Sequence, residues 1–164
     1  MLAMPTPPST PSDELKERIR EFVQDLNMGQ VYTVNKEGFP TGRTIGANLN
    51  DDWSVDLMQA KDNGRVTQVR RHPQMAIEWN DGGRSGNLNI PKAVFLRGIG
   101  ETFEGDRLVM AYNKRMDRME KRGSTRPRLP EAQVREELVG IHVRPVLVRA
   151  EGFGDYAEVF VWAP

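Results

Sequence analysis

The sequence contains no cysteine among its 164 residues. Disulfides, iron–sulfur clusters, thiolate zinc sites and cysteine nucleophiles are therefore excluded. Histidine is scarce as well, since His72 and His142 are the only two. They lie too far apart for a ligand spacing such as His-x-x-x-His. We interpret His72 as a helix-end residue and His142 as a polar strand residue, and we expect no metal site.

Long apolar runs and an excess of one charge are absent too. No run approaches the roughly 20 apolar residues that cross a bilayer, and residues 1–12 lack the basic and apolar parts of a secretory signal. The 23 basic and 23 acidic residues balance. No overall field would therefore draw the chain onto nucleic acid or an anionic membrane. We expect a cytoplasmic protein that binds neither.

The length and the proline content predict the domain organisation. A chain of 164 residues is long enough for one domain with a core of its own. Residues 1–11 include four prolines, which predicts a disordered lead before a single domain over residues 12–164. The first helix is expected to be capped by Thr10 and to begin at Pro11. Apolar residues recur along it at the spacing of one helix face: Leu15, Ile19, Phe22, Val23 and Leu26.

Hydrophobic patterning predicts a protein that is mainly β with some α. Three more helices are expected over residues 66–71, 106–122 and 131–138. β-branched and aromatic residues predict strands over residues 31–34, 39–49, 53–59, 75–79, 92–104, 139–150 and 157–162. Tight connections favour a meander of the first strands, and Gly98 and Gly100 predict a kink in the strand 92–104. Apolar residues on both strand faces, as at Val143 and Val146, favour a closed or nearly closed barrel.

One turn has the composition of a phosphate site. Residues 61–65 break the strand 53–59, a short helix follows, and Pro73 ends that helix. The turn offers free backbone N–H groups, the amide of Asn63 and the positive charge of Arg65 at a helix start, which together favour an anion. A plain tight turn at Asn63–Gly64 explains the same residues, and the two interpretations are compatible.

The order of these elements resembles the pyridoxamine 5'-phosphate oxidase-like split-barrel superfamily, which includes general stress proteins and deazaflavin-dependent reductases. The resemblance covers Leu15 to Trp162 and is carried by Gly42–Ala47, by Met58–Arg65 and by Leu96–Glu101. Arg65 lies eight residues before Pro73, which matches the basic phosphate-binding position of the superfamily. The resemblance implies an antiparallel split β-barrel of Greek-key topology with flanking helices, FMN as cofactor, and a homodimer that holds the cofactor between subunits.

The resemblance also implies which residues bind the cofactor. They are Arg43, Thr44, Ile45, Gly46, Met58, Gln59, Asn63, Arg65, Gln68 and Trp162. Arg43, Asn63 and Arg65 would hold the phosphate, whereas Trp162 would lie near the cofactor of the partner subunit. Without the resemblance, Arg43 and Arg65 would be interpreted as solvated surface arginines. For Gln68 the sequence leaves contact with the ligand and exposure to water equally open.

The function that the resemblance implies is an FMN-binding oxidoreductase. Hydride would pass through the flavin to or from a small molecule, with NAD(P)H as one donor. No catalytic acid or base stands out, so the catalytic residues stay unknown, as suits chemistry that the cofactor performs. No arginine follows Trp162, which argues against oxidation of pyridoxamine phosphate itself.

Two alternatives remain open. The first is a reductase that uses the deazaflavin coenzyme F-420, and the second is a non-catalytic stress protein that binds flavin or haem. Residues 114–128 contain seven basic and two acidic residues. This basic stretch is either a solvated surface or a landing site for an anionic tail, such as the oligoglutamate of a deazaflavin coenzyme.

Overall fold

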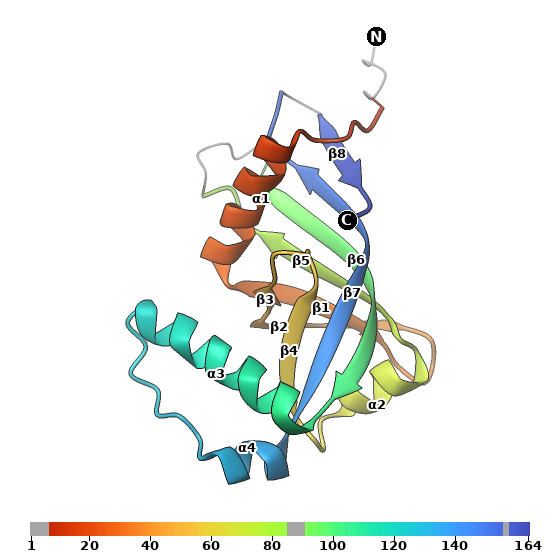
Figure 1. The fold of residues 1–164 in the computed structure, drawn as a ribbon. Coiled ribbons are helices and arrows are strands. Elements are labelled where there is room, and N and C mark those ends of the chain that lie inside the picture. The colour runs from red at the N-terminus through yellow and green to blue at the C-terminus, as the bar shows by residue number, and fades with distance from the viewer. Residues whose placement is uncertain (1–6, 85–90, 156–157) are drawn as a thin grey trace.

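The structure is a computed structural model that describes residues 7–84, 91–155 and 158–164. The described residues form four helices and eight strands (Figure 1). The helices are α1 (Asp13–Leu26), α2 (Gly64–Arg71), α3 (Gly105–Lys121) and α4 (Glu131–Glu137). The strands are β1 (Met28–Val34), β2 (Pro40–Gly46), β3 (Asn48–Leu49), β4 (Val55–Ala60), β5 (Gln74–Asn80), β6 (Ala93–Phe103), β7 (Leu138–Glu151) and β8 (Val159–Trp162).

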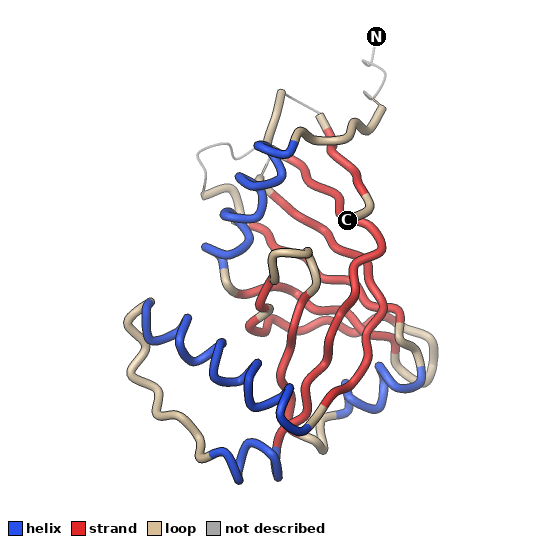
Figure 2. Tube along the Cα trace, in the orientation of Figure 1, coloured by secondary structure: helices blue, strands red, loops and turns tan. Residues whose placement is uncertain are grey.

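The strands form one antiparallel sheet in the order β2-β1-β5-β6-β7-β4-β3, with β8 paired to β7 (Figure 2). Strands β2 and β3 end this order on opposite sides, yet Ala47 alone separates them in the sequence. The sheet must therefore curl until its two edges approach each other, which makes a half-barrel. The expected class, an antiparallel barrel that is mainly β with flanking helices, is confirmed.

Two details of the strand prediction were wrong. The expected strand 39–49 is divided at Ala47, whose backbone N–H donates to the carbonyl of Asn27 at 3.2 Å instead of to a strand. The meander ends after the β1–β2 hairpin, because β4 pairs with β7 and β3 rather than with β2. Both errors arise where the chain crosses from one sheet edge to the other, and short tight turns do not reveal such a crossing.

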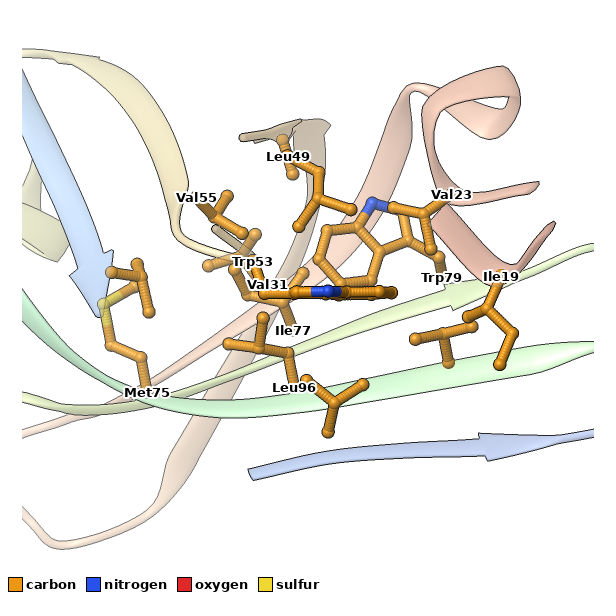
Figure 3. Close-up of a cluster of buried hydrophobic side chains, with 14 of the residues drawn as sticks. Ile19, Val23, Val31, Leu49, Trp53, Val55, Met75, Ile77, Trp79 and Leu96 are labelled. Atoms are coloured by element: carbon orange, nitrogen blue, oxygen red, sulfur yellow. The ribbon is translucent and has the colours of Figure 1, made fainter. Parts of the chain in front are cut away.

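The main hydrophobic core lies on the concave side of the curved sheet, and α1 covers it. Ile19 and Val23 on α1 face the side chains of Trp79, Ile77 and other residues of the strands (Figure 3). The expected start of α1 was wrong: the helix begins at Asp13, because Ser12 accepts a hydrogen bond from the Leu15 N–H at 3.2 Å and so provides the cap. The predicted apolar stripe is the face that packs on the sheet.

A second, smaller core lies beneath α3 and α4. It consists of Met58, Phe103, Leu108, Tyr112, Met116 and Val134. Gly140 on β7 makes room for it, since a Cβ atom there would lie 2.3 Å from the Phe103 ring. This core fixes α3 beside β4 and near the end of β2, so that side chains of α3 can reach the sheet edge.

Other expectations concern β6, the N-terminus and membranes. The kink in β6 is confirmed as a shift of register between Arg97 and Gly98.

Residues 1–6 of the expected disordered lead lie outside the described residues. Within the described part of this lead, the Ser9 N–H donates to the Val159 carbonyl at 3.0 Å, and the Ser9 carbonyl accepts from the Val161 N–H at 2.9 Å. Within the described residues, none of the helices has the length and apolar character needed to cross a membrane.

Candidate functional site

The predicted phosphate turn is built by the cap of helix α2. Asn63 is the N-cap residue, and its side-chain Oδ1 accepts a hydrogen bond from the Arg65 N–H at 2.9 Å. This cap starts the helix at Gly64, two residues earlier than the sequence predicted. The helix ends where the His72 N–H donates to the Gln68 carbonyl, immediately before Pro73. Asn63 therefore fixes the backbone from which Arg65 extends.

Helix α2 and strand β2 enclose a pocket of about 330 Å³, here called the phosphate pocket. Its lining residues are Thr41, Gly42, Arg43, Asn63, Gly64, Arg65 and Gln68. Four of the predicted site residues therefore come together from two separate elements. No carboxylate is among these lining residues, although the pocket holds two guanidinium groups.

Arg65 is a buried cation without a counter-ion among the described residues. Its side chain is 7% exposed, and its Nη1 donates to Gln59 Oε1 at 3.0 Å, while its Nε has no hydrogen-bond partner there. Burial lowers the pKa of Arg65, and the nearby charge of Arg43 lowers this pKa further. The guanidinium nevertheless stays charged at neutral pH. Because buried charges are normally paired, the pocket is suited to an anion.

Gln68 is held in place by two threonine hydroxyls. The hydroxyl groups of Thr33 and Thr41 donate to Gln68 Oε1 at 2.6 and 3.2 Å. The carbonyl end of this side chain is thereby used, which leaves the Nε2 hydrogens to donate into the pocket. Sequence reasoning missed Thr33 and Thr41. The available signal was their pairing across the β1–β2 hairpin, where the two residues face each other.

The remaining predicted residues of β2 lie along its free edge. Within the described residues, β2 pairs with β1 alone, so its other edge has no strand partner. Thr44 is exposed and its hydroxyl accepts from Gln30, whereas Ile45 packs partly against the main core. Gly46 is buried and lies against a guanidinium of α3.

Met58 and Gln59 line a second pocket, of about 230 Å³, here called the Arg115 pocket. Its lining residues are Met58, Gln59, Ala60, Tyr112, Arg115, Met116, Met119, Arg126, Leu129 and Leu138. Gln59 connects the two pockets, because it lines this one and accepts from Arg65 of the other. The role of Arg115 and Arg126 was not specified by the sequence, which marked them only as part of a basic stretch.

Trp162 lies apart from both pockets of its own chain. It is buried in the main core, where its ring meets that of Trp53 edge-on at 5.0 Å between centroids. Its strand β8 is at the end of the molecule opposite α2 (Figure 1). The expected contact of Trp162 with the cofactor of a partner subunit stays a prediction.

Comparisons with known proteins identify the fold. No family model matches the chain, and no curated protein sequence matches it. Among solved structures, a putative pyridoxamine 5'-phosphate oxidase from Listeria innocua is 15% identical, with a TM-score of 0.61 over 83% of this chain and 97% of that one. HutZ, the haem storage protein of Vibrio cholerae, is 17% identical, with a TM-score of 0.66 over 85% and 96%.

A third structure, an F420 reductase, is 17% identical, with a TM-score of 0.62 over 79% of this chain and 94% of that one. The chain thus has the split-barrel fold of the pyridoxamine 5'-phosphate oxidase-like superfamily, as its sequence resemblance implied. By their names, the proteins that share this fold include a pyridoxamine 5'-phosphate oxidase, a haem storage protein and an F420 reductase, so the particular function has to come from the site.

Proposed function

We propose that the protein binds FMN, with the cofactor phosphate in the phosphate pocket, and acts as a flavin-dependent oxidoreductase. The observation that carries this proposal is the pair of guanidinium groups of Arg43 and Arg65 in a pocket without a lining carboxylate. A phosphate offers several charge-assisted acceptors to such a pair. The start of α2 adds the positive end of the helix dipole, while its Arg65 and Val66 N–H groups already donate to Asn63.

The residues found around the pocket fit this cofactor. The unpartnered Nε of the buried Arg65 needs an acceptor, and a phosphate oxygen would provide it. Gln59 orients the Arg65 side chain, and Gln68 would add a donor from its fixed amide. The free edge of β2 at Thr44–Gly46, together with Met58, would line the ring. Bound FMN would supply hydride transfer, and the chain would supply position and a partly desolvated site.

A second candidate is a reductase that uses the deazaflavin coenzyme F-420. It is favoured by the same uncompensated cations, since this coenzyme also carries anionic groups, and by the F420 reductase that shares the fold. A non-catalytic protein that binds flavin or haem would also be compatible with the fold, since a haem storage protein shares this fold.

The nature of the ligand released from the natively purified protein tests these candidates. We expect one FMN per chain, identified by its yellow absorbance and its mass, and reduction of the bound FMN by NADH or NADPH. A deazaflavin mass would instead favour the second candidate. Bound FMN that neither nicotinamide reduces would favour a carrier. A protein that binds neither FMN nor a deazaflavin, even when the apoprotein is titrated with them, would contradict the proposed function.

We also propose that the protein is a homodimer. An apolar groove of about 350 Å³ lies on the sheet face formed by β1, β5, β6 and β7, and Val146 at its border is 49% exposed. Exposed apolar surface of this kind marks interaction sites. Light scattering should give twice the mass of the chain, and Val146→Glu should shift the protein toward the monomer. Met110→Glu is the matched control, because Met110 is 72% exposed on α3, outside the groove. A wild-type monomer would contradict this proposal.

A further inference from the structure

Most basic residues of α3 and the loop after it are engaged by the protein itself. Lys114 donates to the Asn50 side chain at 3.2 Å, and Arg118 donates to the Leu49 carbonyl at 3.5 Å. Arg122 donates to the Asp25 carbonyl at 3.3 Å. Arg128 forms ion pairs with Glu120 and Asp117, at 2.8 and 2.5 Å. These contacts give the basic stretch a structural role along most of its length.

Three basic residues are exceptions among the described residues: the exposed Lys121, and Arg115 and Arg126, which line one pocket. In the part of the chain that the structure describes, neither arginine side chain has a hydrogen bond or an ion pair to a protein group. Arg115 is half-buried, whereas Arg126 is exposed. Burial lowers the pKa of Arg115, and the adjacent charge of Arg126 lowers this pKa further. Two like charges thus share one pocket without a carboxylate among its lining residues, which costs free energy that a bound anion would offset.

The Arg115 guanidinium is seated on the backbone of strand β2. A Cβ atom at Gly46 would lie 2.8 Å from Arg115 Nη2 and 3.3 Å from its Cζ, so the absence of a side chain at this position makes room for the guanidinium. Gly46 and Arg43 are three residues apart on β2, roughly 10 Å at the rise of an extended strand. The pair formed by Arg115 and Arg126 is therefore a second cationic site, near the other end of the same strand from the phosphate pocket.

Apolar side chains form part of the wall of the Arg115 pocket, together with Gln59 and Tyr112. Its apolar lining consists of Met58, Met116, Met119, Leu129 and Leu138. The hydroxyl of Tyr112 is already used as an acceptor for the Leu129 N–H at 2.7 Å. Two cations in a pocket of about 230 Å³ that also has apolar walls complement a small molecule with an anionic head and an apolar body.

We propose that the Arg115 pocket binds a small amphipathic anion, a carboxylate or a phosphate ester, at a site separate from the phosphate pocket. Arg115 and Arg126 bind the anionic head, and the methionine and leucine side chains contact the body. The proposal does not require a bound flavin. If the proposed function is also correct, Gln59, which lines this pocket and accepts from Arg65, places the anion beside the bound FMN, which makes an anionic amphiphile the substrate class.

Calorimetric titration of the full-length protein with benzoate, phenyl phosphate and neutral benzamide tests the proposal. At low salt we expect benzoate or phenyl phosphate to bind at least about tenfold more tightly than benzamide, because charged hydrogen bonds carry the affinity. The tighter of the two anions identifies the head group. Arg115→Gln and Arg126→Gln should each weaken anion binding about tenfold and leave benzamide unchanged. Since Arg126 is exposed, its variant is expected to fold even if the Arg115 variant does not.

Arg128→Gln is the matched control, because it removes the same charge two residues from Arg126 but from an ion-paired side chain. It should leave anion binding within twofold. Equal losses from Arg126→Gln and Arg128→Gln, or equal binding of the anions and benzamide, would overturn the site. The same titrations on FMN-loaded protein separate the two proposals. Suppose that FMN displaces the anion, and that Arg126→Gln weakens FMN binding as much as it weakens anion binding. Arg115 and Arg126 then bind the cofactor, and the proposal of a separate anion site is wrong. If no FMN binds but the anion does, the proposed function fails and the Arg115 pocket stands.

Discussion

Replacement of Arg65 by methionine should weaken FMN binding by about 10- to 100-fold and change riboflavin binding by less than about threefold, since hydrogen bonds to charged groups contribute roughly 1.5–3 kcal/mol. FMN and riboflavin differ by the phosphate alone, so a loss confined to FMN reports on the group that Arg65 contacts. Methionine keeps most of the apolar stem that Arg65 buries, which limits the damage to packing. Quenching of flavin fluorescence measures both affinities.

The control for this prediction lies on the same helix. Arg70 is exposed, lines neither pocket and is five residues further along α2, so Arg70→Met removes an equal charge without touching the site. It should leave both flavins bound as in the wild type. Equal weakening of FMN and riboflavin by Arg65→Met would show that the side chain supports the ring or the fold, and it would remove the basis for the assigned phosphate pocket.

The sequence could predict this pocket because most of its parts are close together in the chain. Asn63, Arg65 and Gln68 lie within six residues, and a strand, a cap and a proline bound the segment. Arg43 needed the resemblance to the split-barrel superfamily, since an arginine on an exposed strand has no feature that distinguishes it from a surface residue. Local chemistry thus indicated the proposed anion site, and only the fold brought its second cation into place.

The parts that could not be predicted depend on contacts between distant segments. The Arg115 guanidinium lies beside Gly46, although the two residues are 69 positions apart in the sequence (115 minus 46). No local sequence feature at either residue predicts this contact. The same holds for the pairing of β4 with β7, which sets the sheet order. At the start of α1, by contrast, Ser12 and Thr10 are both good caps by type. The hydrogen bond of the Leu15 N–H to Ser12 decided between them.

The largest effect on stability is expected at Trp79. Trp79 is the largest of the fully buried side chains among the described residues. It lies in the main core between α1 and the sheet (Figure 3). Trp79→Ala should lower the free energy of unfolding by about 3–5 kcal/mol, through lost burial and the cavity left behind. For a domain of this length, the melting temperature should fall by roughly 6–20 °C. Thermal and urea unfolding, followed by circular dichroism, measure both quantities.

Two further variants show which property of Trp79 matters. Its indole Nε1 is buried and has no hydrogen-bond partner among the described residues, so the N–H group costs stability while the ring contributes it. Trp79→Phe removes that N–H group and keeps an aromatic ring, and it should therefore cost clearly less than Trp79→Ala. Phe39→Ala, at a residue that is 67% exposed, should have little effect on unfolding. If Trp79→Phe is as damaging as Trp79→Ala, the indole nitrogen holds a partner such as a water molecule, and burial of the ring is not the main contribution.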